Sequence, residues 1–151
     1  MKRSIAQILF TGIFLSAYAQ SINFPKPKPT PQNENIGMIV CNHIKENAIY
    51  SSKKDKDGHE VLGRSLQTKY LTYNYQCHYG QNTPIGIYVD LESKVTGRSK
   101  GFIDNSIDGT IEFIVLNRDQ IIPFNELEKK EKKKSKLEFE NALKLYHDFN
   151  N

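Results

Sequence analysis

The stretch Thr110–Phe124 constrains the fold most, because it is the longest β-branched and aliphatic run in the chain. Only Glu112 is polar within its first strand, which is therefore expected to be covered on both faces at a sheet centre. Asn and Asp within positions 117–120 favour a turn, since both tolerate left-handed backbone. The return strand Ile121–Phe124 contains Pro123, which lacks a backbone donor and predicts an edge or a strand end. The whole stretch predicts a β-hairpin.

Residues 1–19 have the pattern of a secretory signal peptide. Lys2 and Arg3 precede an apolar stretch that is shorter than the ~20 residues of a membrane span. The small residues of Ala17-Tyr18-Ala19 fit a cleavage site after Ala19. Cleavage there would lower the formal net charge from +4 to +2, because it removes two cations and no acidic residue. The sequence thus predicts an exported protein with no membrane span and no strong electrostatic preference for nucleic acid.

Residues 20–34 carry four prolines at every second position, which predicts an extended linker of polyproline-II type. The alternative is a proline-rich ligand for an aromatic groove. Residues 35–124 are then expected to form a single α+β domain, and residues 125–151 a C-terminal lysine-rich amphipathic helix. The six lysines of Lys129–Lys136 are interpreted as a solvated helical face, with contact to phosphate or a membrane surface as the alternative.

Cys41 and Cys77 are the two cysteines of the chain, and in an exported protein they predict one disulfide. It would close a loop of 36 residues between positions 41 and 77 and stabilise the fold by about 3–4 kcal/mol. Two buried free thiols are the alternative. His43 and His78 lie near the cysteines in sequence, but their spacing does not fit a zinc site and oxidised cysteine cannot bind metal. Neither a metal nor another cofactor is predicted.

Two elements are expected before the sheet proper. The apolar run Ile36–Val40 predicts a first strand. Ser and Asp residues typical of helix entry precede residues 57–67, where Val61, Leu62 and Leu66 recur at one-turn spacing and predict a short helix.

Strict alternation of apolar and polar residues predicts a second hairpin. Its strands are 71–79 and 85–91, joined by the five-residue connection 80–84. One face would carry three tyrosines, whose hydroxyls must reach water or a partner. Residues 93–109 follow as a long glycine-bearing loop, with or without a short strand. The predicted fold class is α+β: an antiparallel sheet of four or more strands, one short N-terminal helix and a C-terminal amphipathic helix.

The second hairpin and the loop after it provide the candidate binding residues. Tyrosines on strands can stack on single-stranded bases, and nearby cations can hold phosphate, although such tyrosines also line core rims. The predicted binding surface consists of Tyr73, Tyr75, His78, Tyr88, Lys94, Arg98 and Lys100.

Short motifs within residues 41–124 carry a family resemblance. They are Cys41 followed by Ile49-Tyr50-Ser51-Ser52, the strand pair around Ile85–Val89 with the loop Gly97–Gly101, and Phe113–Asn117 followed by Gln120-Ile121. The chain resembles small secreted fungal ribonucleases of the guanyl-specific type. It is even more similar to their non-catalytic descendants, the RNase-like effectors of biotrophic fungal plant pathogens, which implies a role in virulence.

The resemblance fails where the chemistry would lie. In that family RNA cleavage implies a base, an acid and a phosphate clamp. Phe113 stands where the family has an arginine, the strand after the turn has no histidine, and His78 has no carboxylate partner recognisable in the sequence. The resemblance therefore implies an RNase-like fold without catalytic residues.

The predicted function is a small secreted, effector-like protein that binds without catalysis, acting outside the cell or after translocation into a host cell. A host protein is the preferred partner and RNA the other. The first alternative is an active secreted ribonuclease or other hydrolase, although no catalytic constellation can be assigned. The second is a secreted structural or surface interaction protein.

Overall fold

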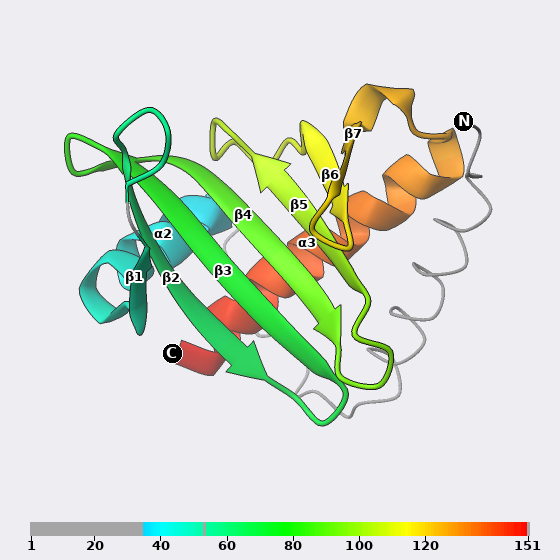
Figure 1. The fold of residues 1–151 in the computed structure, drawn as a ribbon, viewed down its shortest axis with the longest axis horizontal. Helices are drawn as coiled ribbons and strands as arrows, with labels where there is room; N and C mark the ends of the chain where they lie inside the picture. Colours follow the sequence, from blue (N-terminus) through cyan, green and yellow to red (C-terminus); the bar gives the residue numbers. More distant parts are fainter. Residues whose placement is uncertain (1–34, 53, 151) are drawn as a thin grey trace.

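The computed structural model describes residues 35–52 and 54–150, which form a seven-stranded sheet and two long helices. The helices are α2, Ile36–Asn47, and α3, Lys129–Asn150, with the short 3-10 helix η1 at Phe124–Glu126. Both long helices lie behind the same face of the sheet, and α3 crosses that face diagonally (Figure 1). The predicted signal peptide and proline-rich linker, residues 1–34, lie outside the described residues.

All strands are antiparallel, and each pairs with the next one along the chain. They are β1 Tyr50–Ser52, β2 Glu60–Gln67, β3 Leu71–Gly80, β4 Thr83–Ser93, β5 Ser99–Asp104, β6 Phe113–Leu116 and β7 Gln120–Pro123. The predicted α+β class, the antiparallel sheet and the C-terminal helix are confirmed. No helix in the described part of the chain is long and apolar enough to cross a membrane.

The alternation along β3 separates the two faces of the sheet. Every second residue from Leu71 to Tyr79 is buried in the core with side chains of α2 and α3, and the residues between them face the other way. The β3–β4 connection is tighter than predicted, because β3 runs on to Gly80 and β4 begins at Thr83. Gln81 and Asn82 make this two-residue turn with φ of 49° and 69°.

A helix occupies residues 36–47, so the strand predicted at 36–40 is wrong, as is the placement of the N-terminal helix at 57–67. The Asn35 side chain caps α2 by accepting the Met38 N–H at 3.1 Å. The buried side of α2 consists of Gly37, Val40, Cys41 and Ile44, a helical spacing that becomes visible only when the pattern is followed to position 44. The predicted disulfide Cys41–Cys77 is present and links α2 to β3.

Residues 60–67 form β2, which pairs with β3 over its whole length from Glu60↔Tyr79 to Gln67↔Thr72. Asp55, one of the residues typical of helix entry, closes a turn instead, since its side chain accepts the backbone N–H of Asp57 at 3.0 Å. Tertiary pairing with a long neighbouring strand has here outweighed a weak helical pattern.

The hairpin predicted at 110–124 exists as β6 and β7, but it forms the end of the sheet and not its centre. Asn117 and Arg118 make the turn with φ of 50° and 66°. Pro123 ends the edge strand β7, as predicted. Ile114 and Leu116 belong to the core cluster, whereas Val115 pairs with Ile121 on the opposite face, which explains the two-sided apolar character of β6.

Candidate functional site

The face of the sheet opposite the helices carries a groove of about 1090 Å³. Among the described residues no helix lies over this face (Figure 1). The groove changes character across the sheet. Its polar end, on β3 and on the turn before β2, consists of Asp55, Asp57, His59, Asn74, Gln76 and His78, and its apolar end, on β5 to β7, consists of Ile103, Phe113, Val115 and Ile121.

Two tyrosine rings lie over glycines on neighbouring strands and form part of the groove wall. Tyr50 of β1 covers Gly63 of β2, and Tyr88 of β4 covers Gly101 of β5, so that a Cβ at either glycine would collide with the ring. Burial raises the pKa of the Tyr88 hydroxyl, and the charge of Asp90 raises it further. Burial likewise raises the pKa of Tyr50. Both phenols therefore stay neutral at physiological pH and remain able to donate a hydrogen bond.

Gly101→Ala should lower the free energy of unfolding by about 1–3 kcal/mol, because the new methyl group occupies the space of the Tyr88 ring. Gly86→Ala is the matched control. Gly86 lines the groove, as Tyr88 does, but a Cβ built at Gly86 meets its nearest atoms at 3.6 Å, an ordinary contact. Gly86→Ala should therefore change the free energy of unfolding by no more than about 0.5 kcal/mol. Urea unfolding of both variants measures the difference, and equal losses would contradict this packing of Tyr88.

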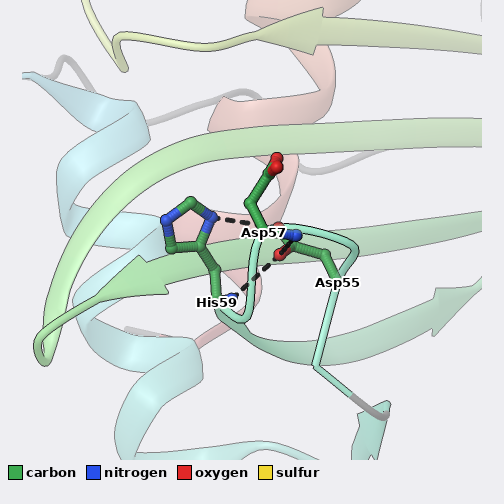
Figure 2. A group of neighbouring side chains, drawn as sticks. All are labelled: Asp55, Asp57 and His59. Atoms are coloured by element: carbon green, nitrogen blue, oxygen red, sulfur yellow. Dashed lines mark hydrogen bonds and ion pairs between the residues drawn. The ribbon is translucent and has the colours of Figure 1, made fainter.

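A cluster of Asp55, His59 and His78 forms the polar end. Asp55 Oδ2 lies 3.2 Å from His59 Nδ1 and 3.0 Å from His78 Nδ1, while Asp55 Oδ1 accepts the backbone N–H groups of Asp57 and His59. Figure 2 shows the Asp55 carboxylate and the His59 ring facing each other across the turn. Partial desolvation works against ionisation of Asp55, but the hydrogen bonds from these groups outweigh it and lower the pKa of the carboxyl.

Arg118 and two carboxylates occupy the rim beyond Tyr88. Arg118 Nη2 lies 3.1 Å from Asp90 Oδ2, and the same guanidinium also pairs with Glu92. Asp90 is almost fully buried, whereas more than half of the Arg118 side chain is exposed. Two carboxylates thus compensate the charge of this arginine, which is poorly suited to clamp a phosphate.

The structure brings only two of the seven predicted binding residues into the groove, His78 and Tyr88. Tyr73 and Tyr75 lie on the helix face, and the hydroxyl of Tyr75 donates to the Ala142 carbonyl at 2.7 Å. Lys100 is buried too, with its Nζ 2.8 Å from Glu131 and 2.7 Å from Glu138. These three side chains cannot contact a partner of the folded protein.

The remaining two, Lys94 and Arg98, are exposed around the β4–β5 turn. Lys94 Nζ donates to Gln67 Oε1 at 3.1 Å. The tyrosines and cations grouped by the sequence therefore do not form one surface, because strand alternation places three of the seven residues under the helices.

The carboxylate partner of His78 is not evident from the sequence. Asp55 lies 23 positions earlier, and only the antiparallel pairing of β2 with β3 brings the two side chains together. The available signal was the Asp-x-Asp-x-His pattern of residues 55–59 directly before a strand, which alone does not tell a turn from a site.

A second carboxylate cluster, Asp104, Asp108 and Glu112, has a structural role. Asp104 Oδ1 accepts three backbone N–H groups, including that of Ile107 at 2.6 Å, and Asp104 Oδ2 accepts the N–H of Gly109 at 2.8 Å. Its oxygens are thus occupied in holding the loop after β5, where Ile107 is buried with φ of 56°.

Comparison with known proteins gives no relative: no family model, no curated protein and no solved structure matches the chain.

Proposed function

We propose that this chain is a secreted, effector-like binding protein that acts without catalysis and holds a short segment of a partner protein in the groove on its open sheet face. The groove itself carries this proposal. It combines an apolar end, suited to an aliphatic or aromatic anchor, with a polar end that can fix the orientation of the segment. Large apolar side chains exposed in a concave surface are typical of interaction sites.

A protein segment suits the groove better than RNA. Its charged lining residues are Asp55, Asp57 and Asp90 against Lys56 and Arg118, which leaves a formal charge of −1 when the histidines are neutral. RNA-binding grooves are positively charged, since the phosphate backbone supplies most of the affinity. The burial of Tyr73, Tyr75 and Lys100 also removes two of the three predicted stacking tyrosines and one of the three predicted phosphate-binding cations from the surface.

One observation favours the second candidate, a ribonuclease or other hydrolase. Asp55 and His78 form a carboxylate–imidazole pair within the groove, as in many general acid–base sites. A second acid–base group and a free phosphate clamp would also be needed, and Arg118 is already paired with Asp90 and Glu92. We therefore keep catalysis as the alternative.

The groove can be tested with one exposed aliphatic residue and a matched control. Ile121 lines the groove and is 62% exposed, whereas Leu137 on α3 is 56% exposed and does not line it. Peptides selected from a random display library on the wild-type protein are measured by fluorescence polarisation in EDTA. We expect Ile121→Glu to weaken their binding at least about tenfold, the loss of roughly 1.4 kcal/mol of apolar contact, and Leu137→Glu to leave it unchanged.

Two results would contradict the proposed function. Peptides that bind both variants equally would place the interaction outside the groove. Tight binding of a fluorescent single-stranded RNA that falls steeply with salt and is weakened by replacing Lys94 and Arg98 with alanine would identify RNA as the partner. A cleavage assay on the same RNA addresses the hydrolase, because activity lost in His78→Ala would make the protein an enzyme.

A further inference from the structure

The two histidines of the polar end converge on one carboxylate oxygen. Asp55 Oδ2 lies 3.0 Å from His78 Nδ1 and 3.2 Å from His59 Nδ1, and both histidines point the same ring nitrogen at it. These two distances from Asp55 Oδ2 are close to the ~3.3 Å that separates ligand atoms around a tetrahedral Zn²⁺ with bonds of about 2.05 Å, and the two imidazoles would close around the ion. We propose that Asp55, His59 and His78 form a binding site for Zn²⁺ or a similar first-row transition-metal ion.

The local backbone holds these groups before any metal arrives. Asp55 Oδ1 accepts the N–H of Asp57 at 3.0 Å and of His59 at 2.9 Å, which fixes the carboxylate and directs Oδ2 at the imidazoles. The Asp55 N–H donates to the His59 carbonyl at 2.9 Å, which closes the turn. His78 comes from β3, in register with Val61 of β2, so the site ties the turn to the sheet. The carboxylate and its turn are thus held in place before the metal binds, which reduces the rearrangement that binding requires.

The metal has a route to the site and a fourth ligand nearby. The side chains of His59 and His78 are 36% and 34% exposed, and all three proposed ligands line the open groove. A carboxylate oxygen of Asp57 lies within 4.8 Å of ligand atoms of Asp55 and His59. When Nδ1 binds the ion, the single proton of a neutral imidazole must sit on Nε2, so a ring that donated its Nδ1–H to Asp55 changes tautomer and stays neutral.

Two imidazoles and a carboxylate select the kind of ion. This set suits Zn²⁺, Co²⁺, Ni²⁺ and Cu²⁺, whereas Ca²⁺ and Mg²⁺ prefer oxygen ligands alone. The cluster around Asp104 makes an internal contrast, because its central carboxylate is already committed to four backbone N–H groups and no histidine belongs to it. The metal site shares the polar end of the proposed peptide-binding groove, and peptide binding measured in EDTA keeps the two proposals separately testable.

Isothermal titration of the untagged, disulfide-bonded protein with ZnCl₂ tests the site. We expect one Zn²⁺ per chain, no response to Mg²⁺ or Ca²⁺, and weaker binding as the pH falls, since protons compete for the imidazoles. His59→Ala and His78→Ala should each weaken binding by more than about tenfold. His147→Ala is the matched control, because His147 also lies near a carboxylate, with its Nδ1 3.5 Å from Asp148, but belongs to no such cluster.

The proposed metal site can also be tested on the wild-type protein alone, whether or not the variants fold. Addition of Co²⁺ to the wild-type protein should produce visible absorption bands that Zn²⁺ abolishes by competition. Wild-type protein that shows neither these bands nor one-to-one Zn²⁺ binding would overturn the proposal. So would Zn²⁺ binding that survives in folded His59→Ala and His78→Ala proteins, with folding checked by circular dichroism.

Discussion

Replacing both Cys41 and Cys77 by alanine should lower the free energy of unfolding by about 3–4 kcal/mol. The disulfide closes a loop of 36 residues, and its loss gives the unfolded chain more conformations. Both cysteines are fully buried between α2 and β3, so the bridge also fastens the N-terminal helix to the sheet. Guanidinium unfolding provides the free energy and its dependence on denaturant, the m-value. The m-value should rise in the double variant, because an uncrosslinked unfolded chain exposes more surface.

The wild-type protein supplies the control for this measurement. If the effect arises from the cross-link, wild-type protein equilibrated in denaturant with reductant should approach the stability of the double variant, without any change of sequence. A loss below about 1 kcal/mol with an unchanged m-value would show that α2 is held by its packing alone.

Local alternation was the most dependable signal in this sequence. The pattern of β3 predicts its span and its two faces, because every second residue of a strand points the same way. The same pattern does not say which face the helices cover. The alternation therefore leaves Tyr73 and Tyr75 as candidates for a binding surface, whereas in the structure they belong to the core.

The elements predicted wrongly had short or ambiguous patterns. An apolar run such as Ile36–Val40 fits a strand or one side of a helix equally well. The N-cap at Asn35 and the buried Ile44, one turn beyond the run, favour the helix. Residues 60–67 combine a weak helical spacing with Gly63, which the fold needs because the Tyr50 ring lies over it. The local sequence pattern does not indicate such a contact.

The candidate site depends on long-range pairing even more than the fold does. His78 could be identified from the sequence as a polar residue on a half-buried strand, but its partner Asp55 comes from the turn before β2, which was expected to lead into a helix. Once residues 60–67 are a strand, the pairing of Val61 with His78 brings that turn to the groove. One wrong secondary-structure prediction thus concealed the site.

Lys100 is expected at the surface from its sequence context, but its buried ion pairs help to determine how α3 packs on the sheet. The sequence places this lysine among exposed cations, and it places Glu131 as the single acidic residue within a run of six lysines. In the structure both face inward, with Lys100 Nζ 2.8 Å from Glu131 and 2.7 Å from Glu138, while most of the lysines of the run face solvent. The buried cluster joins β5 to α3 and fixes which side of α3 contacts the sheet.

Lys100→Met should therefore cost about 3–5 kcal/mol of unfolding free energy at pH 7, because it leaves two buried carboxylates without their cation. Burial raises the pKa of Glu138 even beside Lys100, and without the lysine the pKa of Glu138 should be raised further. A folded pKa above the unfolded value of about 4.3 means that the folded state binds more protons, so stability increases as the pH falls. The difference in unfolding free energy between the wild-type protein and Lys100→Met should be greatest at neutral pH and should shrink towards about pH 4.

Two further proteins separate lost charge pairing from lost packing. Lys134→Met removes a cation 4.0 Å from Glu138 at the edge of the cluster and should cost less than about 1 kcal/mol. The triple variant Lys100→Met, Glu131→Leu, Glu138→Leu removes all three charges and should regain most of the stability lost in Lys100→Met, since apolar residues can replace a buried ionic cluster without loss. If the triple variant is no more stable than Lys100→Met, or if the Lys100→Met deficit does not change with pH, unpaired carboxylates are not the cause.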